Sequence, residues 1–260
     1  MTDPVKTRRD GHVLEITLDR PKANAVDLAT SRIMGDVFQS FRDDRNLRVA
    51  ILTGAGEKFF CAGWDLKAAA DGDDVDGNYG VGGFGGLQEL GQMNKPVISA
   101  VNGICCGGGL EIAMSADIVL AADHASFALP EIRSGTVADA ASVFMPKRIP
   151  YHIAMEYLLT GRWFDVDEAH RWGMVNQIHP AGDLMDQARQ MAHHIASGPP
   201  LVMAAIKEIV REAEDMRFQD MLSRITKRQL GTVDTLYASE DQMEGARAFA
   251  EKRDPVWKGR

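Results

Sequence analysis

Two glutamates, Glu111 and Glu131, each follow a segment that exposes backbone amides, and together they suggest acid–base chemistry. Residues 107–109 are consecutive glycines that lead into an apolar, helix-like stretch. Because glycines leave N–H groups uncovered and a helix N-terminus favours negative charge, this segment can hold an oxyanion. If the helix begins near Gly108, the Glu111 carboxylate lies one turn later on the same face. A second carboxylate from Glu131 would complete a pair suited to moving protons at a carbon next to a carbonyl.

The alternative for both glutamates is a solvated surface position, because glycines before a helix are common. Two local features favour a functional role. Glu111 lies inside an apolar run, residues 110–116, where a carboxylate must be paired, hydrogen-bonded or functional. Glu131 follows a short strand-like run, residues 126–129, that Pro130 ends. We therefore keep the acid–base interpretation.

Strand-like and helix-like segments alternate through the first two thirds of the chain, which indicates an α/β fold. Asp27 can cap a helix with one apolar face. The residues of that face are Ile33, Met34, Val37, Phe38 and Phe41. Apolar, often β-branched runs predict strands over residues 12–18, 49–54, 96–103 and 117–122.

The remaining segments predict a loop and a separate helical module. Residues 71–86 are glycine-rich and partly acidic, which is typical of a mobile loop, either a lid or an inert surface segment. From Ala188 onward the chain consists of helix formers with few strand-like runs. We predict a core over residues 1–190 and a helical C-terminal module over residues 191–260.

The composition is that of a globular protein rather than a disordered, fibrous or membrane-spanning chain. Of 260 residues, 45% are hydrophobic and 25% charged. No apolar run reaches the roughly 18 residues that a bilayer span needs, and no apolar signal segment precedes the first strand, so we expect a cytoplasmic protein. The net charge of −8 argues against a general nucleic-acid surface. A polyanionic ligand would need a local lysine cluster or backbone amides.

The cysteines and histidines do not predict a metal site. Cys61, Cys105 and Cys106 form an odd set whose adjacent pair is unsuited to a disulfide, so we expect reduced, buried thiols. No spacing of histidines and cysteines matches the usual zinc patterns. We expect no metal.

Five segments, in order and at consistent spacing, resemble the crotonase (enoyl-CoA hydratase/isomerase) family over nearly the whole chain. They are residues 21–25, 61–67, 102–103 together with 107–111, 130–131 and 251–253. The resemblance implies a spiral of repeated β-β-α turns with a C-terminal helical module that makes trimer contacts, often in a hexamer of two trimers. It implies an enzyme that adds or removes water across the α,β bond of an acyl-CoA thioester. No separate cofactor is expected, because coenzyme A is part of the substrate, and neither nucleic acid nor membrane is an expected partner.

The resemblance also assigns roles to individual positions. The N–H groups of Trp64 and Gly108 would form the oxyanion hole for the thioester oxygen, and Glu111 and Glu131 would flank a water or substrate hydroxyl. In dehydration Glu131 would take the α-proton while protonated Glu111 helps the hydroxyl leave, although the two roles stay interchangeable here. The positions implied for coenzyme A, with the last one reaching from a neighbouring subunit, are Lys22, Ala23, Ala25, Ala62, Asp65, Leu66, Lys67 and Lys252.

Two features bear on the acyl group. The family's usual proline and glycine pair after Glu131 are replaced by Ala138 and by Ala141-Ser142, and these side chains are expected to fill space near the acyl end. Residues 54–60, 64–70 and 251–260 resemble family members whose substrates carry a trimethylammonium on the acyl group. Such a tail would need aromatic faces or a carboxylate, from among Trp64, Tyr79, Phe84 and Asp139.

Three alternatives stay open. Isomerisation, decarboxylation or thioester hydrolysis would reuse the oxyanion hole with other acid–base residues, and the two glutamates favour hydration over these. A catalytically weak binding protein would result if residues 138–142 closed the pocket. A dinucleotide-binding oxidoreductase would need G-x-G-x-x-G after the first strand, where Asp-Arg-Pro stands at residues 19–21.

Overall fold

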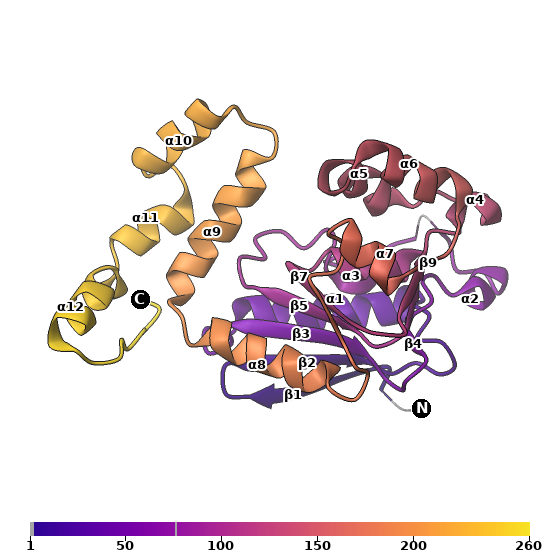
Figure 1. The fold of residues 1–260 in the computed structure, drawn as a ribbon, viewed down its shortest axis with the longest axis horizontal. Helices are drawn as coiled ribbons and strands as arrows, with labels where there is room; N and C mark the ends of the chain where they lie inside the picture. Colours follow the sequence, from indigo (N-terminus) through magenta and orange to yellow (C-terminus); the bar gives the residue numbers. More distant parts are fainter. Residues whose placement is uncertain (1–2, 76) are drawn as a thin grey trace.

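The computed structural model describes residues 3–75 and 77–260 and contains two β-sheets with helices on their faces (Figure 1). The sheet with six strands has the order β1-β2-β3-β5-β7-β10, and the sheet with four strands has the order β4-β6-β8-β9. The first sheet comprises β1 (Val5–Asp10), β2 (Val13–Leu18), β3 (Val49–Gly54), β5 (Val97–Val101), β7 (Ile118–Ala122) and β10 (Gln177–His179). The second comprises β4 (Phe59–Cys61), β6 (Ile104–Cys106), β8 (Ser126–Ala128) and β9 (Phe164–Asp165). Pairing is parallel except between β1 and β2 and between β8 and β9.

Successive turns of the chain repeat the order strand, strand, helix. Strand β3 is followed by β4 and α2 (Leu66–Ala70), β5 by β6 and α3 (Gly108–Met114), and β7 by β8 and α4 (Glu131–Ser134). The first strand of each turn enters the larger sheet and the second enters the smaller one. This is the β-β-α spiral that the resemblance implies.

The strands and the helix predicted from hydrophobic patterns are confirmed. Strands β3 and β5 are buried at every position, which explains their continuous apolar sequence. Helix α1 (Leu28–Asp43) begins where expected, because the Asp27 side chain accepts a hydrogen bond from Thr30 N at 2.7 Å. The two faces of β3 alternate, with Val49 and Ile51 packing toward α8 (Leu184–Ala196), and Ala50 and Leu52 packing toward α1.

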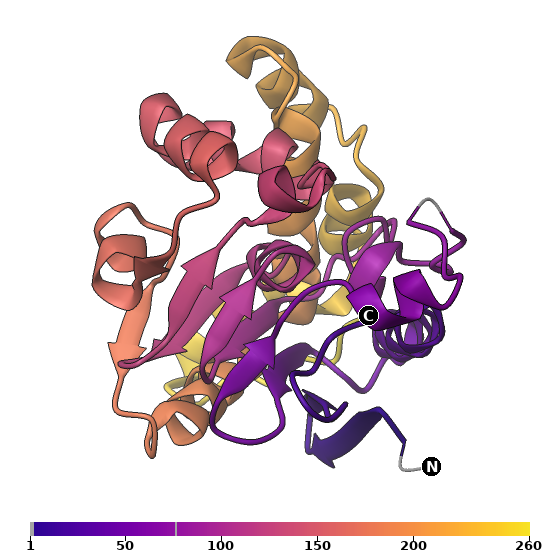
Figure 2. The ribbon, with the colours of Figure 1, turned by 90° about the vertical axis from the view of Figure 1, so that its right-hand side faces the viewer.

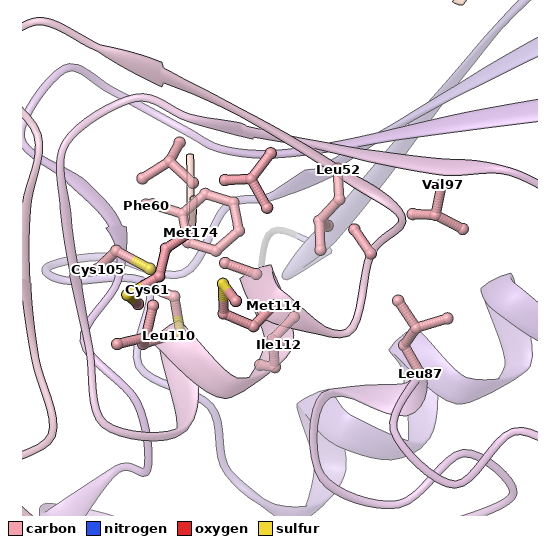
Figure 3. Packing of buried hydrophobic residues seen from close by; sticks show 14 of the residues in the cluster. Leu52, Phe60, Cys61, Leu87, Val97, Cys105, Leu110, Ile112, Met114 and Met174 are labelled. Atoms are coloured by element: carbon pink, nitrogen blue, oxygen red, sulfur yellow. The ribbon is translucent and has the colours of Figure 1, made fainter. Parts of the chain in front are cut away.

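The main core lies between α1, the two sheets and α3. Figure 3 shows Leu110, Ile112 and Met114 of α3 close to Phe60 and other buried side chains of this cluster. Every residue of α3 is buried. A helix enclosed on all sides cannot tilt without opening the core, so the amides at its N-terminus are held in place.

The C-terminal helices form a module with its own small core. Helices α9 (Pro200–Ala213), α10 (Phe218–Thr226) and α11 (Gly231–Tyr237) share a cluster that includes Ala205, Met221 and Val233, and α12 (Glu244–Glu251) follows. The module lies to one side of the core in Figure 1 and behind it in Figure 2. The predicted division after residue 190 falls inside α8, which packs on the larger sheet. We propose a boundary between residues 196 and 200.

Three further helices cover the smaller sheet and the site. They are α5 (Asp139–Arg148), α6 (Tyr151–Thr160) and α7 (Val166–Arg171). Within residues 3–75 and 77–260, no helix is both long and apolar enough to cross a bilayer. The three cysteines are buried free thiols, as expected.

Candidate active site

Three functional positions follow three neighbouring parallel strands. Trp64 comes after β4, Gly108 after β6 and Glu131 after β8. Strands β4, β6 and β8 are adjacent and parallel, so their carboxyl ends meet at one edge of the smaller sheet. The spiral therefore brings together residues that are 67 positions apart in the sequence (131 − 64).

The backbone amide of Trp64 is left free by the way its loop is held. Val26 N donates to Gly63 O at 2.8 Å, and Asp65 N donates to Val26 O at 2.9 Å, which together form a parallel bridge between Val26 and Trp64. The bridge uses the groups on either side of Trp64, so the N–H of Trp64 points away from Val26. This N–H donates to no other described residue.

The amide of Gly108 lies beside the same loop. It opens α3 and donates to no other described residue. A Cβ on Gly63 would lie 2.9 Å from Gly108 N, so the residue before Trp64 touches the Gly108 amide. Two uncommitted N–H donors therefore lie in contacting segments, as an oxyanion hole requires.

Glu111 is buried next to these amides and is held by α5. Its side chain is 7% exposed, and Oε1 accepts a hydrogen bond from Ala141 N at 2.9 Å. Burial raises the pKa of Glu111 to about 7, the Ala141 amide opposes the rise, and the charges of Glu131 and Asp139 add to it. Near neutral pH this carboxyl group can both give and take a proton.

Glu131 reaches the same spot from α4. Its Oε1 lies over Gly107, where a Cβ would come within 2.8 Å of the oxygen. Its Oε2 is buried and has no hydrogen-bond partner among the described residues. Burial raises the pKa of Glu131. An acceptor that is buried and unpaired is costly for folding, which favours a role in binding or in proton transfer.

Comparisons with known proteins show the family of the chain. Residues 8–260 match the family model described as enoyl-CoA hydratase/isomerase. The chain belongs to this family. It is 52% identical to proteins named carnitinyl-CoA dehydratase from Salmonella arizonae, over 260 residues, and from Escherichia coli strain K12, over 261 residues, covering 100% of both chains in each case.

Solved structures of the enoyl-CoA hydratase/isomerase family share the fold. An enoyl-CoA hydratase from Mycobacterium marinum is 39% identical with a TM-score of 0.89, covering 99% of each chain. An enoyl-CoA hydratase from Bacillus anthracis is 31% identical with a TM-score of 0.90, covering 99% of this chain and 100% of that one. The crotonase fold with its C-terminal helices is thereby confirmed.

The departures from the family pattern after Glu131 are absorbed by α5. Ala138 precedes the helix and Ala141 lies in its first turn, and both are buried, whereas Ser142 is exposed. The N–H of Ala141 is the donor that holds Glu111. The segment that replaces the family's proline and glycines therefore forms the start of a helix. An amide in the first turn of that helix holds the Glu111 carboxyl group.

The glycine-rich segment is packed against the site at its C-terminal end, whereas residue 76 lies outside the described residues. A Cβ on Gly108 would come within 2.3 Å of Phe84 Cε1, so the Phe84 ring rests on Gly108. Gly85 N donates to Ser31 Oγ of α1 at 3.0 Å, and a Cβ on Gly85 would meet Ile112 at 2.3 Å. Residues 82–83 and 85–86 are buried. In this part of the segment glycine allows the backbone to pack closely against α1 and α3, whereas the sequence predicted a mobile loop.

The positions implied for coenzyme A fall into two groups. Most lie on two contacting loops or directly after them, since Ala62 N donates to Ala23 O at 3.1 Å. Lys22 is exposed on the first loop, and Lys67 is exposed in α2, which follows the second. Leu66 is 63% exposed beside them. Lys252 directly follows α12, which lies at the opposite end of the molecule from α2 (Figure 1). One chain alone therefore does not bring Lys252 to these loops.

Arg20 has a part in the site that sequence reasoning missed. Its guanidinium donates to Ala25 O, to Asp65 and to Asp27. Asp65, one of the positions implied for coenzyme A, also caps α2 through Lys67 N and so is committed to the protein. Arg20 thus joins Asp65, the residue after Trp64, to Asp27 at the start of α1. The sequence offered one indication of this role, because Asp27 and Asp65 can each cap a helix and Arg20 stands next to a proline.

The residues proposed for a cationic acyl tail differ in how the structure relates them to the site. The Tyr79 and Phe84 rings meet edge to face at 5.4 Å, and Phe84 contacts Gly108. The indole Nε1 of Trp64 is buried without a partner among the described residues. The negative charge of Asp139 acts on both Glu111 and Glu131.

Proposed function

We propose that this chain is a hydro-lyase of the enoyl-CoA hydratase type that interconverts crotonobetainyl-CoA and carnitinyl-CoA. Its 52% identity to proteins named carnitinyl-CoA dehydratase supports the substrate. One observation carries the reaction type: two carboxyl groups with raised pKa values, Glu111 and Glu131, beside the unpaired amides of Trp64 and Gly108. Hydration needs both an acid and a base, and these two carboxyl groups could supply both.

The two amides would stabilise the charge that forms on the thioester. When the proton on the α-carbon leaves, negative charge moves to the carbonyl oxygen. The N–H groups of Trp64 and Gly108 would donate to that oxygen, each lowering the barrier by about 3 kcal/mol. Because α3 is enclosed by the core, its amide needs little reorganisation as the charge develops.

The glutamates would exchange protons with the two reacting carbons. In dehydration Glu131 would take the α-proton as the bond to the β-hydroxyl breaks, and protonated Glu111 would pass its proton to the departing hydroxyl to form water. In hydration the same groups would act in reverse, adding OH to the β-carbon and H to the α-carbon. A pKa of about 7 for Glu111 supports its protonated role at neutral pH.

Coenzyme A would lie along the loop that carries Lys22 and the start of α2 that carries Lys67, because the charges of these lysines suit its phosphates. Lys252 could reach these phosphates only from a neighbouring copy, so we further propose that the active form is a trimer or a dimer of trimers. No cofactor enters the scheme, since the glutamates and amides account for each proton and charge.

Loss of enoyl absorbance would test the function directly. Wild-type protein should hydrate crotonobetainyl-CoA, and Glu111→Gln and Glu131→Gln should each lower kcat by about 100-fold or more while the substrate still binds. Glu57→Gln, which alters an exposed glutamate, is the matched control. Full activity in either active-site variant, or no turnover of any α,β-unsaturated acyl-CoA by the wild type, would contradict the proposal.

A further inference from the structure

We propose that Phe84 is a positioning residue of the oxyanion hole, whose ring holds the Gly108 amide in the orientation needed to donate to the thioester oxygen. The inference rests on the proposed function and assigns Phe84 a part in it. Two observations carry it: the ring lies directly against Gly108, and the segment that bears the ring is held between α1 and α3.

The orientation of the Gly108 amide is not fixed by its own residue. Gly107, Gly108 and Gly109 have no side chains, and glycine leaves the backbone free to adopt several conformations. The Gly108 N–H donates to no other described residue, as expected for the first residue of a helix. Neighbouring segments must therefore hold this amide, and a residue that packs on Gly108 affects its direction.

Phe84 is such a neighbour. A Cβ built on Gly108 would lie 2.3 Å from Cε1, 2.8 Å from Cζ and 3.1 Å from Cδ1 of the Phe84 ring. One edge of the ring thus fills the space that a side chain at position 108 would occupy. Likewise, a Cβ built on Gly63 would lie 2.9 Å from Gly108 N. Gly108 is therefore packed against both the Phe84 ring and the residue before Trp64.

The 3-10 turn that bears the ring, η1 (Phe84–Gly86), is anchored to α1. Gly85 N donates to Ser31 Oγ at 3.0 Å, and Ser31 is fully buried on α1. A Cβ built on Gly86 would lie 2.3 Å from Gly35 N, so the backbones of η1 and α1 touch. A contact without intervening side chains leaves η1 little room to move relative to α1.

The same turn also contacts α3 at a second point. A Cβ built on Gly85 would lie 2.3 Å from both Cγ1 and Cδ1 of Ile112, which is 1% exposed. Ile112 lies about one helical turn after Gly108 on α3. Phe84 and Gly85 therefore hold the first turn of α3 at both of its ends. The Tyr79 ring meets Phe84 edge to face, with centroids 5.4 Å apart, and further restricts its rotation.

Loss of this support would act on the transition state more than on substrate binding. Negative charge reaches the thioester oxygen only as the reaction proceeds, so a misdirected amide raises the barrier while leaving contacts with coenzyme A intact. Removal of one oxyanion donor typically lowers kcat by about 100- to 1000-fold, and a displaced donor should lose part of that effect. Positioning therefore predicts a fall in kcat with little change in KM.

Two other roles for Phe84 must be separated from positioning. The ring could recognise a cationic acyl tail through its π face, or it could only stabilise the fold, since it packs against the main core. Recognition would matter only for a charged ligand, and stabilisation would leave the amide unchanged in the folded protein. The carbonyl stretch of a bound, uncharged thioester distinguishes the three roles, because hydrogen bonds from the oxyanion hole lower its frequency.

The experiment measures kcat and KM for crotonobetainyl-CoA, together with the infrared carbonyl stretch of bound butyryl-CoA that carries an isotope label on the thioester carbonyl. Butyryl-CoA has an uncharged acyl group and no double bond to hydrate. The variants are Phe84→Ala, Phe84→Leu and Ile178→Ala. Ile178 is a partly buried side chain of β10 that packs against the same core, and it provides the matched control.

We expect Phe84→Ala to lower kcat about 10- to 100-fold, to change KM less than about threefold, and to return the carbonyl stretch of bound butyryl-CoA toward the value of the free thioester. Phe84→Leu keeps an apolar side chain that can still contact Gly108, so it should recover part of kcat and part of the frequency shift. Ile178→Ala should lower the free energy of unfolding while leaving kcat and the carbonyl stretch as in the wild type.

Several results would overturn the inference. An unchanged kcat in Phe84→Ala would exclude positioning. A carbonyl stretch that stays at the wild-type value while kcat/KM for crotonobetainyl-CoA falls would instead make the ring a contact for the cationic tail. A wild-type stretch equal to that of the free thioester would show that no donor polarises the carbonyl.

Two further outcomes keep the test decisive. If Phe84→Ala does not fold, the same criteria apply to Phe84→Leu. If the wild type hydrates no enoyl thioester, the proposed function fails, and the carbonyl stretch of bound butyryl-CoA in the Phe84 variants still decides the inference.

Discussion

The backbone amide of Ala141 donates a 2.9 Å hydrogen bond to Oε1 of Glu111, joining the first turn of α5 to a buried acid on α3. Two effects act in opposite directions on the protonation of Glu111. Burial favours the neutral acid, and the amide favours the carboxylate. The balance leaves its pKa near neutrality, which is where a group that alternates between acid and base is most effective.

This balance predicts how stability depends on pH. The pKa of Glu111 is raised from 4.5 to about 7, so between these values the folded protein holds a proton that the unfolded chain releases. The free energy of unfolding therefore falls as pH rises through this window, by about 3 kcal/mol from this group.

Urea denaturation of wild type and Glu111→Gln at a fixed protein concentration checks the prediction. Glutamine cannot ionise, so the variant should gain stability relative to wild type between pH 4.5 and pH 8. A stability difference that is the same at both pH values would show that Glu111 is not buried as a neutral acid. Glu57→Gln, at an exposed position, should show no such trend.

Gly107→Ala should displace the Glu131 carboxylate while leaving the glutamate itself unchanged. Gly107 has φ +58°, and a Cβ there would lie 2.8 Å from Glu131 Oε1. We expect kcat to fall about 100-fold, because a general base displaced by an ångström loses most of its effect. Gly11→Ala is the control, since Gly11 has φ +57° with nothing within 4 Å of a Cβ. Similar kcat values in the two variants would mean that the oxygen is free to move aside.

Arg20 should act as a positioning residue for the amide of Trp64. Arg20→Ala removes the link between Asp65 and Asp27, so the segment at Trp64 and Asp65 loses an anchor. We expect kcat to fall about tenfold or more with a smaller change in KM, along with a loss of about 1–3 kcal/mol in the free energy of unfolding.

Arg42→Ala, which breaks a surface pair with Asp43, should change neither kinetic value. Arg20→Lys should recover only part of the loss, because lysine cannot bind two carboxylates in a fork. Loss of stability in Arg20→Ala with normal kcat would limit Arg20 to a role in folding.

Lys252 should contribute to coenzyme A binding only in the oligomer. Lys252→Ala is expected to weaken coenzyme A binding about three- to tenfold, measured by titration calorimetry at a protein concentration that keeps the oligomer intact. Lys258→Ala, on the same module but paired with Glu240 at 2.9 Å, is the control. An unchanged dissociation constant in Lys252→Ala would exclude a shared site.

Local sequence sufficed for some elements and not for others. Strand β3 and helix α1 were predictable because long apolar patterns and a capping aspartate are short-range features. Strands β4, β6 and β8 have three residues each, too few for a period to show. They exist because the spiral lays them side by side, and such pairing depends on contacts between distant segments.

The same distinction applies to the site. The sequence alone was enough to propose Gly108 and Glu111 as site residues, because a glycine triplet, a helix start and a glutamate in an apolar run all lie within residues 107–111. Only the tertiary structure decided what those residues face. The Ala141 amide on Glu111, the Phe84 ring on Gly108 and the charge of Asp139 on both glutamates join segments far apart in the chain, and their geometry follows from how the turns of the spiral pack rather than from any local pattern.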